Sequence, residues 1–125
     1  MKLLIVDDDV FLRDMYALKF SESDYEVQAA ETAEHALQII EQTPDLKAVL
    51  IDMIMPGMTG IELIREIKER HQSCEAALII LSNQGQESDI AEATEAGASG
   101  YIIKAEAIPS DVVKQVTKIL TKDSD

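Results

Sequence analysis

The run AVLI at residues 48–51 is apolar at every position and ends abruptly at Asp52. Two further runs share this pattern, LLIV at residues 3–6 and ALIIL at residues 77–81. Continuous apolar runs of this length are typical of central strands in a parallel sheet, because helices cover both faces of such a sheet. The three runs therefore predict the middle of a parallel sheet.

Two weaker signals complete the predicted sheet. Residues 25–29 alternate between apolar and polar side chains, which favours an edge strand, and residues 100–103 form a fifth short strand. Helical spacing fills the intervals between the strands. We expect one α/β domain, doubly wound and flavodoxin-like, a (βα)5 chain whose five-stranded parallel sheet has the order 2-1-3-4-5. The domain is expected over residues 1–121, with a polar C-terminal tail at residues 122–125.

The helices are marked by apolar periodicity and by their ends. In the first helix the spacing predicts that Phe11, Met15 and Leu18 face the core. The fourth helix, near residues 87–96, is rich in Ala and closes at Gly97, a residue suited to a helix C-terminus. With Ile90 as its only large aliphatic anchor, this helix is expected to move at low cost.

Composition narrows the possible partners and location. The 125 residues include 11 Lys and Arg against 24 Asp and Glu, a formal net charge of −13. Such a surface argues against direct binding to nucleic acid or to anionic membranes, both of which attract basic proteins. Cys74 is alone, which favours a reducing compartment, and the apolar run at residues 3–6 is too short for a signal peptide. We expect a cytoplasmic protein with no membrane segment.

Polar side chains follow four of the predicted strands, at the point where each strand ends. They are Asp7, Asp8 and Asp9 after the first strand, Asp52 at the end of the third, Ser82 and Asn83 after the fourth, and Lys104 after the fifth. Because the carboxyl ends of parallel strands meet at one edge of the sheet, these groups are expected to share a pocket. Asp9 is expected to cap the first helix instead.

Three carboxylates in one pocket repel one another unless a cation lies among them. A hard divalent cation with oxygen ligands, such as Mg²⁺, meets that need. A carboxylate beside Mg²⁺ and a lysine is a workable nucleophile toward phosphorus, and Ser82 could donate a hydrogen bond to the resulting phosphate. The pocket therefore predicts magnesium-dependent phosphoryl transfer.

Four motifs together resemble the response-regulator receiver domain of two-component signalling. They are LIVDD at residues 4–8, VLIDMIMPGMTG at residues 49–60, ILS at residues 80–82 and GASGYIIK at residues 97–104. The resemblance covers residues 2–120, and the motifs are specific as a set. It implies that Asp52 accepts a phosphoryl group and that Lys104 contacts this group. It also implies that Asp7, Asp8, Asp52 and the backbone carbonyl of Ile54 hold Mg²⁺.

The resemblance further implies a switch and its partners. Ser82 would move toward the phosphate, Tyr101 would fill the vacated space, and the face made by the fourth helix, fifth strand and fifth helix would change shape. The donor would be a sensor histidine kinase or a histidine phosphotransfer protein, and the output a downstream effector or a fused output domain outside these residues. A phosphorylation-dependent dimer is left open. Such a domain catalyses only its own phosphotransfer and autodephosphorylation.

The chain departs from the family pattern beside the pocket. Ala105 stands where the family has Pro after the lysine, which predicts either a trans Lys104–Ala105 bond with a rearranged loop or a strained cis bond. Ile54 and Asn83 are expected to hinder water from reaching the phosphoaspartate, so that the phosphate lasts. Gln84 would oppose them if its amide positioned a water molecule.

The sequence leaves two alternative functions open. A constitutive receiver-like adaptor would bind partners without phosphotransfer, but every reactive group is present. A flavodoxin-like enzyme such as an aspartyl phosphatase would need a second Asp two residues after Asp52, where the chain has Ile54. His35 and His71 lie in helical segments without paired ligand spacing and are expected to face solvent.

Overall fold

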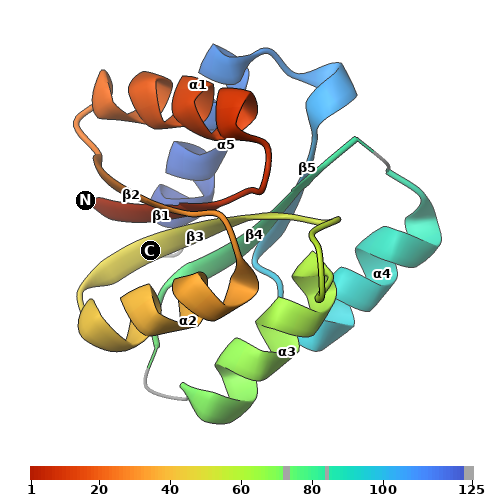
Figure 1. The fold of residues 1–125 in the computed structure, drawn as a ribbon. Helices are drawn as coiled ribbons and strands as arrows, with labels where there is room; N and C mark the ends of the chain where they lie inside the picture. Colours follow the sequence, from red (N-terminus) through yellow and green to blue (C-terminus); the bar gives the residue numbers. More distant parts are fainter. Residues whose placement is uncertain (72–73, 84, 123–125) are drawn as a thin grey trace.

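The computed structural model describes residues 1–71, 74–83 and 85–122. The chain alternates strands and helices throughout (Figure 1). The elements are β1 (Lys2–Val6), α1 (Val10–Ser21), β2 (Glu26–Ala30), α2 (Ala33–Gln42), β3 (Leu46–Asp52), α3 (Gly60–Arg70), β4 (Ala77–Ser82), α4 (Glu87–Ala96), β5 (Gly100–Ile103), a short 3-10 turn at Lys104–Glu106 and α5 (Pro109–Lys122).

The strands form one parallel sheet in the order β2-β1-β3-β4-β5, which confirms the predicted topology. β2 is an edge strand, as its alternating pattern predicts, although it starts and ends one residue later than expected. The register pairs Val6 with Ile51 and Asp52 with Leu81, so the ends of β1, β3 and β4 lie at the same edge of the sheet.

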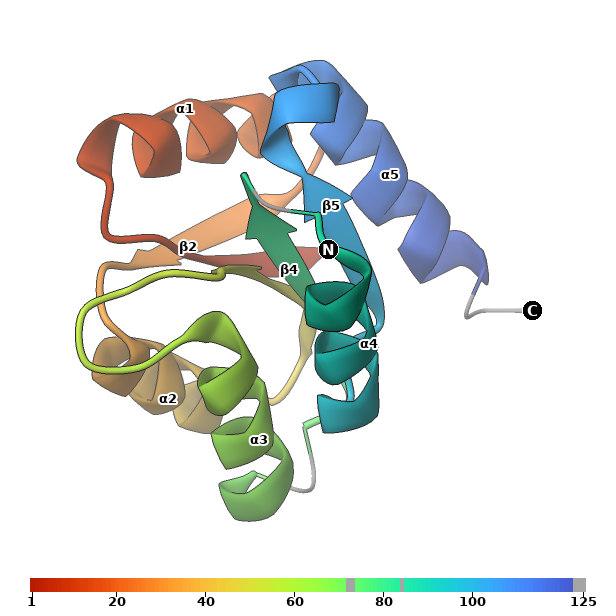
Figure 2. The ribbon, with the colours of Figure 1, turned by 90° about the vertical axis from the view of Figure 1, so that its right-hand side faces the viewer.

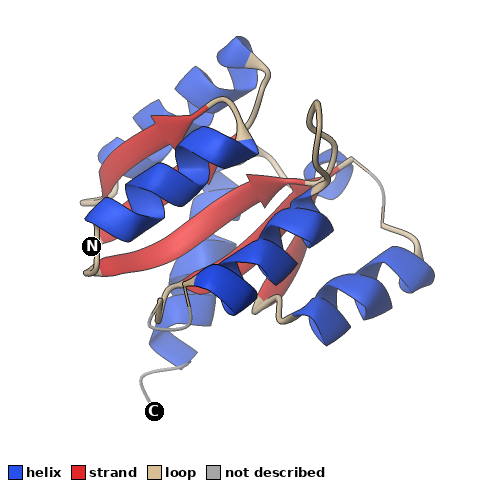
Figure 3. Cartoon of the chain, turned by 60° about the horizontal axis from the view of Figure 1, so that its bottom comes forward, coloured by secondary structure: helices blue, strands red, loops and turns tan. Residues whose placement is uncertain are grey.

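Helices cover both faces of the sheet (Figures 2 and 3). α1 and α5 pack on one face, where their side chains join Leu3 and Ile5 of β1 in one apolar cluster. α2, α3 and α4 pack on the other face, with Leu4 and Val6 in a second cluster. The alternation of β1 between the two clusters explains why its run is apolar at every position.

The orientation of α1 differs from the prediction. Phe11 is 84% exposed, Leu18 is 61% exposed and Met15 is 37% exposed. The buried side chains of α1 are Tyr16 and Phe20, which lie one turn apart on the neighbouring stripe of the helix. The ring of Phe20 meets that of Tyr25 edge-on, with centroids 5.1 Å apart. Tyr16 and Phe20, rather than the predicted stripe, therefore anchor α1 to the sheet.

The observed helix ends agree with the sequence predictions, unlike the buried face of α1. Asp9 caps α1 as predicted, because its side chain accepts hydrogen bonds from the backbone N–H groups of Phe11 and Leu12. Gly97 ends α4 in the left-handed region, at φ +116°. α4 buries only Ala93 and has no side-chain cap, so it is held more weakly than the other described helices.

The Lys104–Ala105 bond is trans, which is one of the two alternatives that the sequence predicts. No described residue follows a cis peptide bond, and Lys104 opens a 3-10 turn before Pro109 begins α5. α5 continues through Lys122, so one residue of the predicted tail belongs to the helix. Residues 123–125 of that tail lie outside the described residues. No helix in the described part of the chain is long and apolar enough to cross a bilayer.

Candidate functional site

A pocket of about 340 Å³ opens at the carboxyl edge of the sheet, where the sequence predicts it. Loops that follow β1, β3, β4 and β5 contribute its walls. Its lining residues are Asp7, Asp8, Asp9, Leu12, Asp52, Ile54, Ser82, Asn83 and Lys104. The topology therefore brings together residues that lie up to about a hundred positions apart in the sequence, as the crossing of parallel strands requires.

Three carboxylates form a tight cluster in this pocket. Carboxylate oxygens of Asp7, Asp8 and Asp52 lie within 4.8 Å of one another. Asp7 is buried, Asp52 is half-buried and Asp8 is exposed. Hard oxygen donors at this spacing, with one side open to water, fit Mg²⁺, which binds through a few carboxylates and retains several waters. The donor set thus suits the predicted ion.

Lys104 is the cation that the structure places against this cluster. Its Nζ lies 3.5 Å from Asp7 Oδ2 and 3.5 Å from Asp52 Oδ1. The lysine side chain is only 9% exposed, so its charge is weakly screened by solvent. One ammonium group thereby bridges two carboxylates and offsets part of their repulsion.

The surroundings of Asp52 raise its pKa to about 6, from an ordinary value of 3.8. Burial is the largest cause, and the negative charges of Asp7 and Asp8 act in the same direction. The Lys104 ammonium acts against them and lowers the pKa of Asp52. The positive charge of Lys104 does not fully compensate the negative charge of the three carboxylates. The site therefore favours the binding of a further cation.

Backbone and arginine contacts hold the loop that carries Asp7 and Asp8. The Asp9 N–H donates to Asp7 Oδ1 at 2.9 Å, and the Asp7 N–H donates to the Ala30 carbonyl at 3.1 Å. Arg13 Nη1 donates to the Asp7 carbonyl oxygen at 3.1 Å. Sequence reasoning missed Arg13, because nothing in the pattern of α1 shows that its guanidinium reaches back to the preceding loop.

The loop after Asp52 depends on a second residue that sequence reasoning missed, Gly60. Its N–H donates to the Met53 carbonyl at 2.8 Å and closes the loop over the end of β3. A Cβ at this position would lie 2.7 Å from the Asp52 carbonyl oxygen, closer than real Cβ contacts come. The only available signal was a glycine at the first position of a helix, a position that has no intrinsic need for one.

The two predicted switch residues lie on neighbouring strands. Ser82, the last residue of β4, is 2% exposed and pairs in register with Ile103. Tyr101 of β5 is half-buried and packs against the cluster on the α2–α3–α4 side of the sheet. Ile54 is 64% exposed at the pocket mouth and Asn83 is exposed beside it, whereas Gln84 lies outside the described residues.

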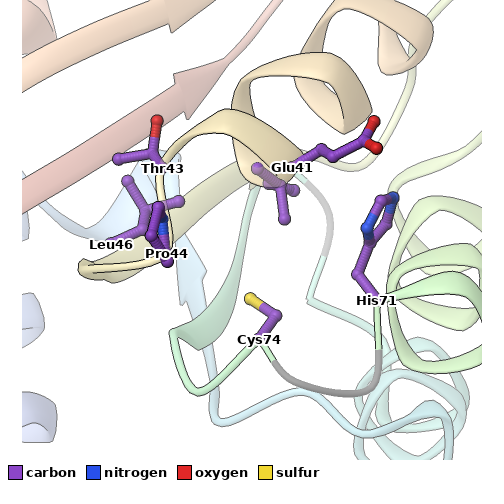
Figure 4. A pocket seen from close by; sticks show the side chains of 7 residues that line it. Glu41, Thr43, Pro44, Leu46, His71 and Cys74 are labelled. Carbon is purple, nitrogen blue, oxygen red and sulfur yellow. The ribbon is translucent and has the colours of Figure 1, made fainter.

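A second pocket, of about 200 Å³, lies where Leu46 begins β3 and Cys74 precedes β4, and Figure 4 shows the side chains that line it. Its walls include Glu41, His71 and Cys74. His71 is half-buried there and only partly faces solvent, while His35 is exposed as expected. Among the described residues, only Asp7, Asp8 and Asp52 form a group of three or more potential metal ligands. His71 and Cys74 therefore belong to no such group.

Comparisons with known proteins agree with this geometry. A family model described as the response regulator receiver domain matches residues 3–117. The phosphate regulon transcriptional regulatory protein PhoB of Pseudomonas aeruginosa is 33% identical over 121 residues, which cover 96% of this chain and 52% of PhoB. The two-component response regulator ORR6 of Oryza sativa subsp. japonica is also 33% identical, over 95% of this chain and 71% of its own length. The chain thus spans about half of PhoB but most of ORR6.

Solved structures share the fold. A DNA-binding response regulator of the LuxR family from Staphylococcus aureus superposes with a TM-score of 0.84 at 26% identity, over 95% of this chain and 98% of that chain. The chemotaxis protein CheY4 of Vibrio cholerae gives a TM-score of 0.86 at 24% identity, over 94% of this chain and 97% of its own. The likeness to CheY4 establishes the architecture alone.

Proposed function

The chain belongs to the response regulator receiver domain family of two-component systems, and on that premise we propose that it is a phosphorylation-activated signalling switch with Asp52 as acceptor. One observation carries the proposal: the carboxylates of Asp7 and Asp8, from the loop after β1, and the ammonium of Lys104, from the segment after β5, converge on Asp52. Like charges gathered in this way are unfavourable unless a function requires them. Phosphoryl transfer is a reaction that uses all four groups.

Asp7, Asp8 and Asp52 would hold Mg²⁺, and the backbone carbonyl of Ile54, which lines the same pocket, is the proposed further ligand. When bound, the ion supplies charge stabilisation for the phosphoryl oxygens. The raised pKa of Asp52 supports this assignment, because a cation in the pocket would favour the ionised carboxylate.

In the proposed transfer, an oxygen of the Asp52 carboxylate bonds to phosphorus as the bond from phosphorus to the partner's histidine nitrogen breaks. Asp52, with a pKa of about 6, is mostly ionised at neutral pH and therefore nucleophilic. Lys104, whose Nζ lies 3.5 Å from Asp52 Oδ1, would donate a hydrogen bond to a phosphoryl oxygen. Positioning and electrostatics supply most of what this chemistry needs.

We place the readout on the face formed by α4, β5 and α5. Ser82 is the proposed hydroxyl that moves toward the phosphate, and Tyr101 on the adjacent strand is the proposed side chain that fills its place. α4 buries only Ala93, so its displacement would disturb little packing. Phosphorylation would thus bias a two-state element rather than build a new fold.

The rim of the pocket supports a protein donor, either a sensor histidine kinase or a histidine phosphotransfer protein. Ile54 lines the pocket and is exposed, and two further exposed apolar side chains follow strands that end at this edge, Phe11 in the first turn of α1 and Ile108 before α5. Such groups are typical of surfaces that contact an apolar part of a protein partner. The output partner, an effector or a fused domain, is proposed only by kind, and the compartment, from the single cysteine, as the cytoplasm.

Intact-mass measurement with acetyl phosphate tests the proposal. The wild-type chain should gain one phosphoryl group in Mg²⁺, and the same chain in EDTA should gain none. Asp52→Asn is the control for the acceptor and should stay unmodified under both conditions. A wild-type chain that binds Mg²⁺ yet takes up no phosphate would instead favour the constitutive adaptor.

A further inference from the structure

The Asp8 carboxylate is the least constrained member of the acidic cluster. Asp7 is held by the Asp9 N–H at 2.9 Å and faces Lys104 at 3.5 Å, and Asp52 faces the same lysine at 3.5 Å. No described residue donates a hydrogen bond to the exposed Asp8 carboxylate or forms an ion pair with it. Its position therefore depends on the backbone that carries it.

Arg13 holds that backbone. Its Nη1 donates to the Asp7 carbonyl oxygen at 3.1 Å, across six residues of sequence, in a half-buried setting. This carbonyl belongs to the peptide unit that joins Asp7 to Asp8, so fixing it restricts the direction in which the Asp8 side chain leaves the loop. Arg13 makes no ion pair with a described carboxylate, although three lie in the neighbouring pocket. The guanidinium donates its hydrogen bond to the Asp7 carbonyl oxygen instead.

We infer that Arg13 is a positioning residue that orients Asp8 for Mg²⁺ through the Asp7–Asp8 peptide, an inference that rests on the proposed function. A second contribution opposes this one: a guanidinium near the pocket repels a cation electrostatically. The two contributions predict opposite signs. If charge dominates, removal of Arg13 strengthens Mg²⁺ binding, whereas if positioning dominates, removal weakens it.

Positioning should dominate, because partners that orient metal ligands commonly change affinity by about tenfold or more when they are removed. Repulsion by the guanidinium, by contrast, acts on an ion held at the open side of the pocket, where Asp8 is exposed and the effective dielectric constant is high. Arg13→Met should therefore raise the dissociation constant for Mg²⁺ by about tenfold. Arg13→Lys keeps a cationic hydrogen-bond donor at this position, and this variant should bind Mg²⁺ nearly as tightly as wild type.

Titration of the full chain with MgCl₂, followed by the backbone amide resonances of Asp8 and Asp9, measures this effect. Arg65→Met is the matched control, because Arg65 of α3 is an exposed arginine that pairs with Glu92 at 3.6 Å. It should leave the dissociation constant unchanged. The unfolding temperature of each variant is measured as well. If Arg13 had only a structural role, its removal would lower the unfolding temperature without weakening Mg²⁺ binding.

Weaker binding in Arg13→Met with recovery in Arg13→Lys supports the inference. Equal or tighter binding in Arg13→Met overturns it while leaving the magnesium site intact. Should Arg13→Met fail to fold, Arg13→Gln, which is equally uncharged but polar, is titrated against the Lys variant, with the same two outcomes. A wild-type chain without Mg²⁺ binding would instead overturn the magnesium part of the proposed function, and this inference with it.

Discussion

Replacement of Asp52 by Asn should stabilise the metal-free protein at neutral pH. The pKa of Asp52 is raised from 3.8 to about 6, mainly by burial, with Asp7 and Asp8 adding to the effect against Lys104. A folded-state pKa above the unfolded value means that the folded chain binds the proton more tightly. The resulting stabilisation is present at low pH and is lost as pH rises through about 6.

The size of the effect follows from the shift. A rise of about two pKa units corresponds to about 3 kcal/mol of destabilisation once the carboxylate is ionised. Solvent reaches part of the carboxylate, so we expect about 1–2 kcal/mol in practice. The Asp52→Asn chain should therefore unfold at higher urea than wild type near neutral pH. The difference should vanish at about pH 4, where Asp52 is protonated in the folded state.

Urea unfolding followed by far-ultraviolet circular dichroism measures both free energies, because the chain has no Trp to report by fluorescence. Wild type and Asp52→Asn are compared in EDTA and then in excess Mg²⁺. The ion should stabilise wild type more than the variant, since it binds the folded acidic cluster. An Asp52→Asn chain less stable than wild type at neutral pH in EDTA would refute the account of charge strain in the pocket.

Three further results are expected. Gly60→Ala should lower the free energy of unfolding by about 2 kcal/mol or more and slow uptake from acetyl phosphate, because its Cβ would stand 2.7 Å from the Asp52 carbonyl; unchanged urea midpoints and uptake would count against this. Ile54→Asn should shorten the lifetime of the phosphorylated chain, measured as phosphate release after removal of the donor, and an equal or longer lifetime would sink the idea that Ile54 excludes water. Phe11→Ser should stay within about 0.5 kcal/mol of wild type in urea, whereas Phe20→Ala should lose about 4 kcal/mol; similar losses in both would mean that α1 is oriented otherwise.

The fold was predictable because several stretches of the sequence indicate it independently. Apolar runs at residues 3–6, 48–51 and 77–81 each need cover on two faces, and parallel strands with intervening helices leave few topologies. The face that α1 buries was not predictable in the same way. Two stripes of this helix fit a helical repeat, one through Phe11 and Met15 and one through Tyr16 and Phe20. Periodicity alone does not decide which stripe meets the sheet.

The same contrast holds in the site. The convergence of Asp7, Asp52 and Lys104 follows from the rule that parallel strands end at one edge. The supporting contacts of Arg13 and Gly60 depend on where a long side chain reaches and on how closely two backbone segments approach. Neither is visible in spacing or composition, so these residues emerge only from the three-dimensional arrangement.

The location of the phosphoryl group tests the central claim most directly. The chain is phosphorylated with acetyl phosphate in Mg²⁺, the acyl phosphate is reduced with borohydride to the alcohol, and the modified residue is identified by peptide mass spectrometry. We predict a single modified position, with Asp52 converted to homoserine. Homoserine in place of Asp7 or Asp8, or an unreduced phosphoserine at Ser82, would contradict the assignment of Asp52 as the acceptor.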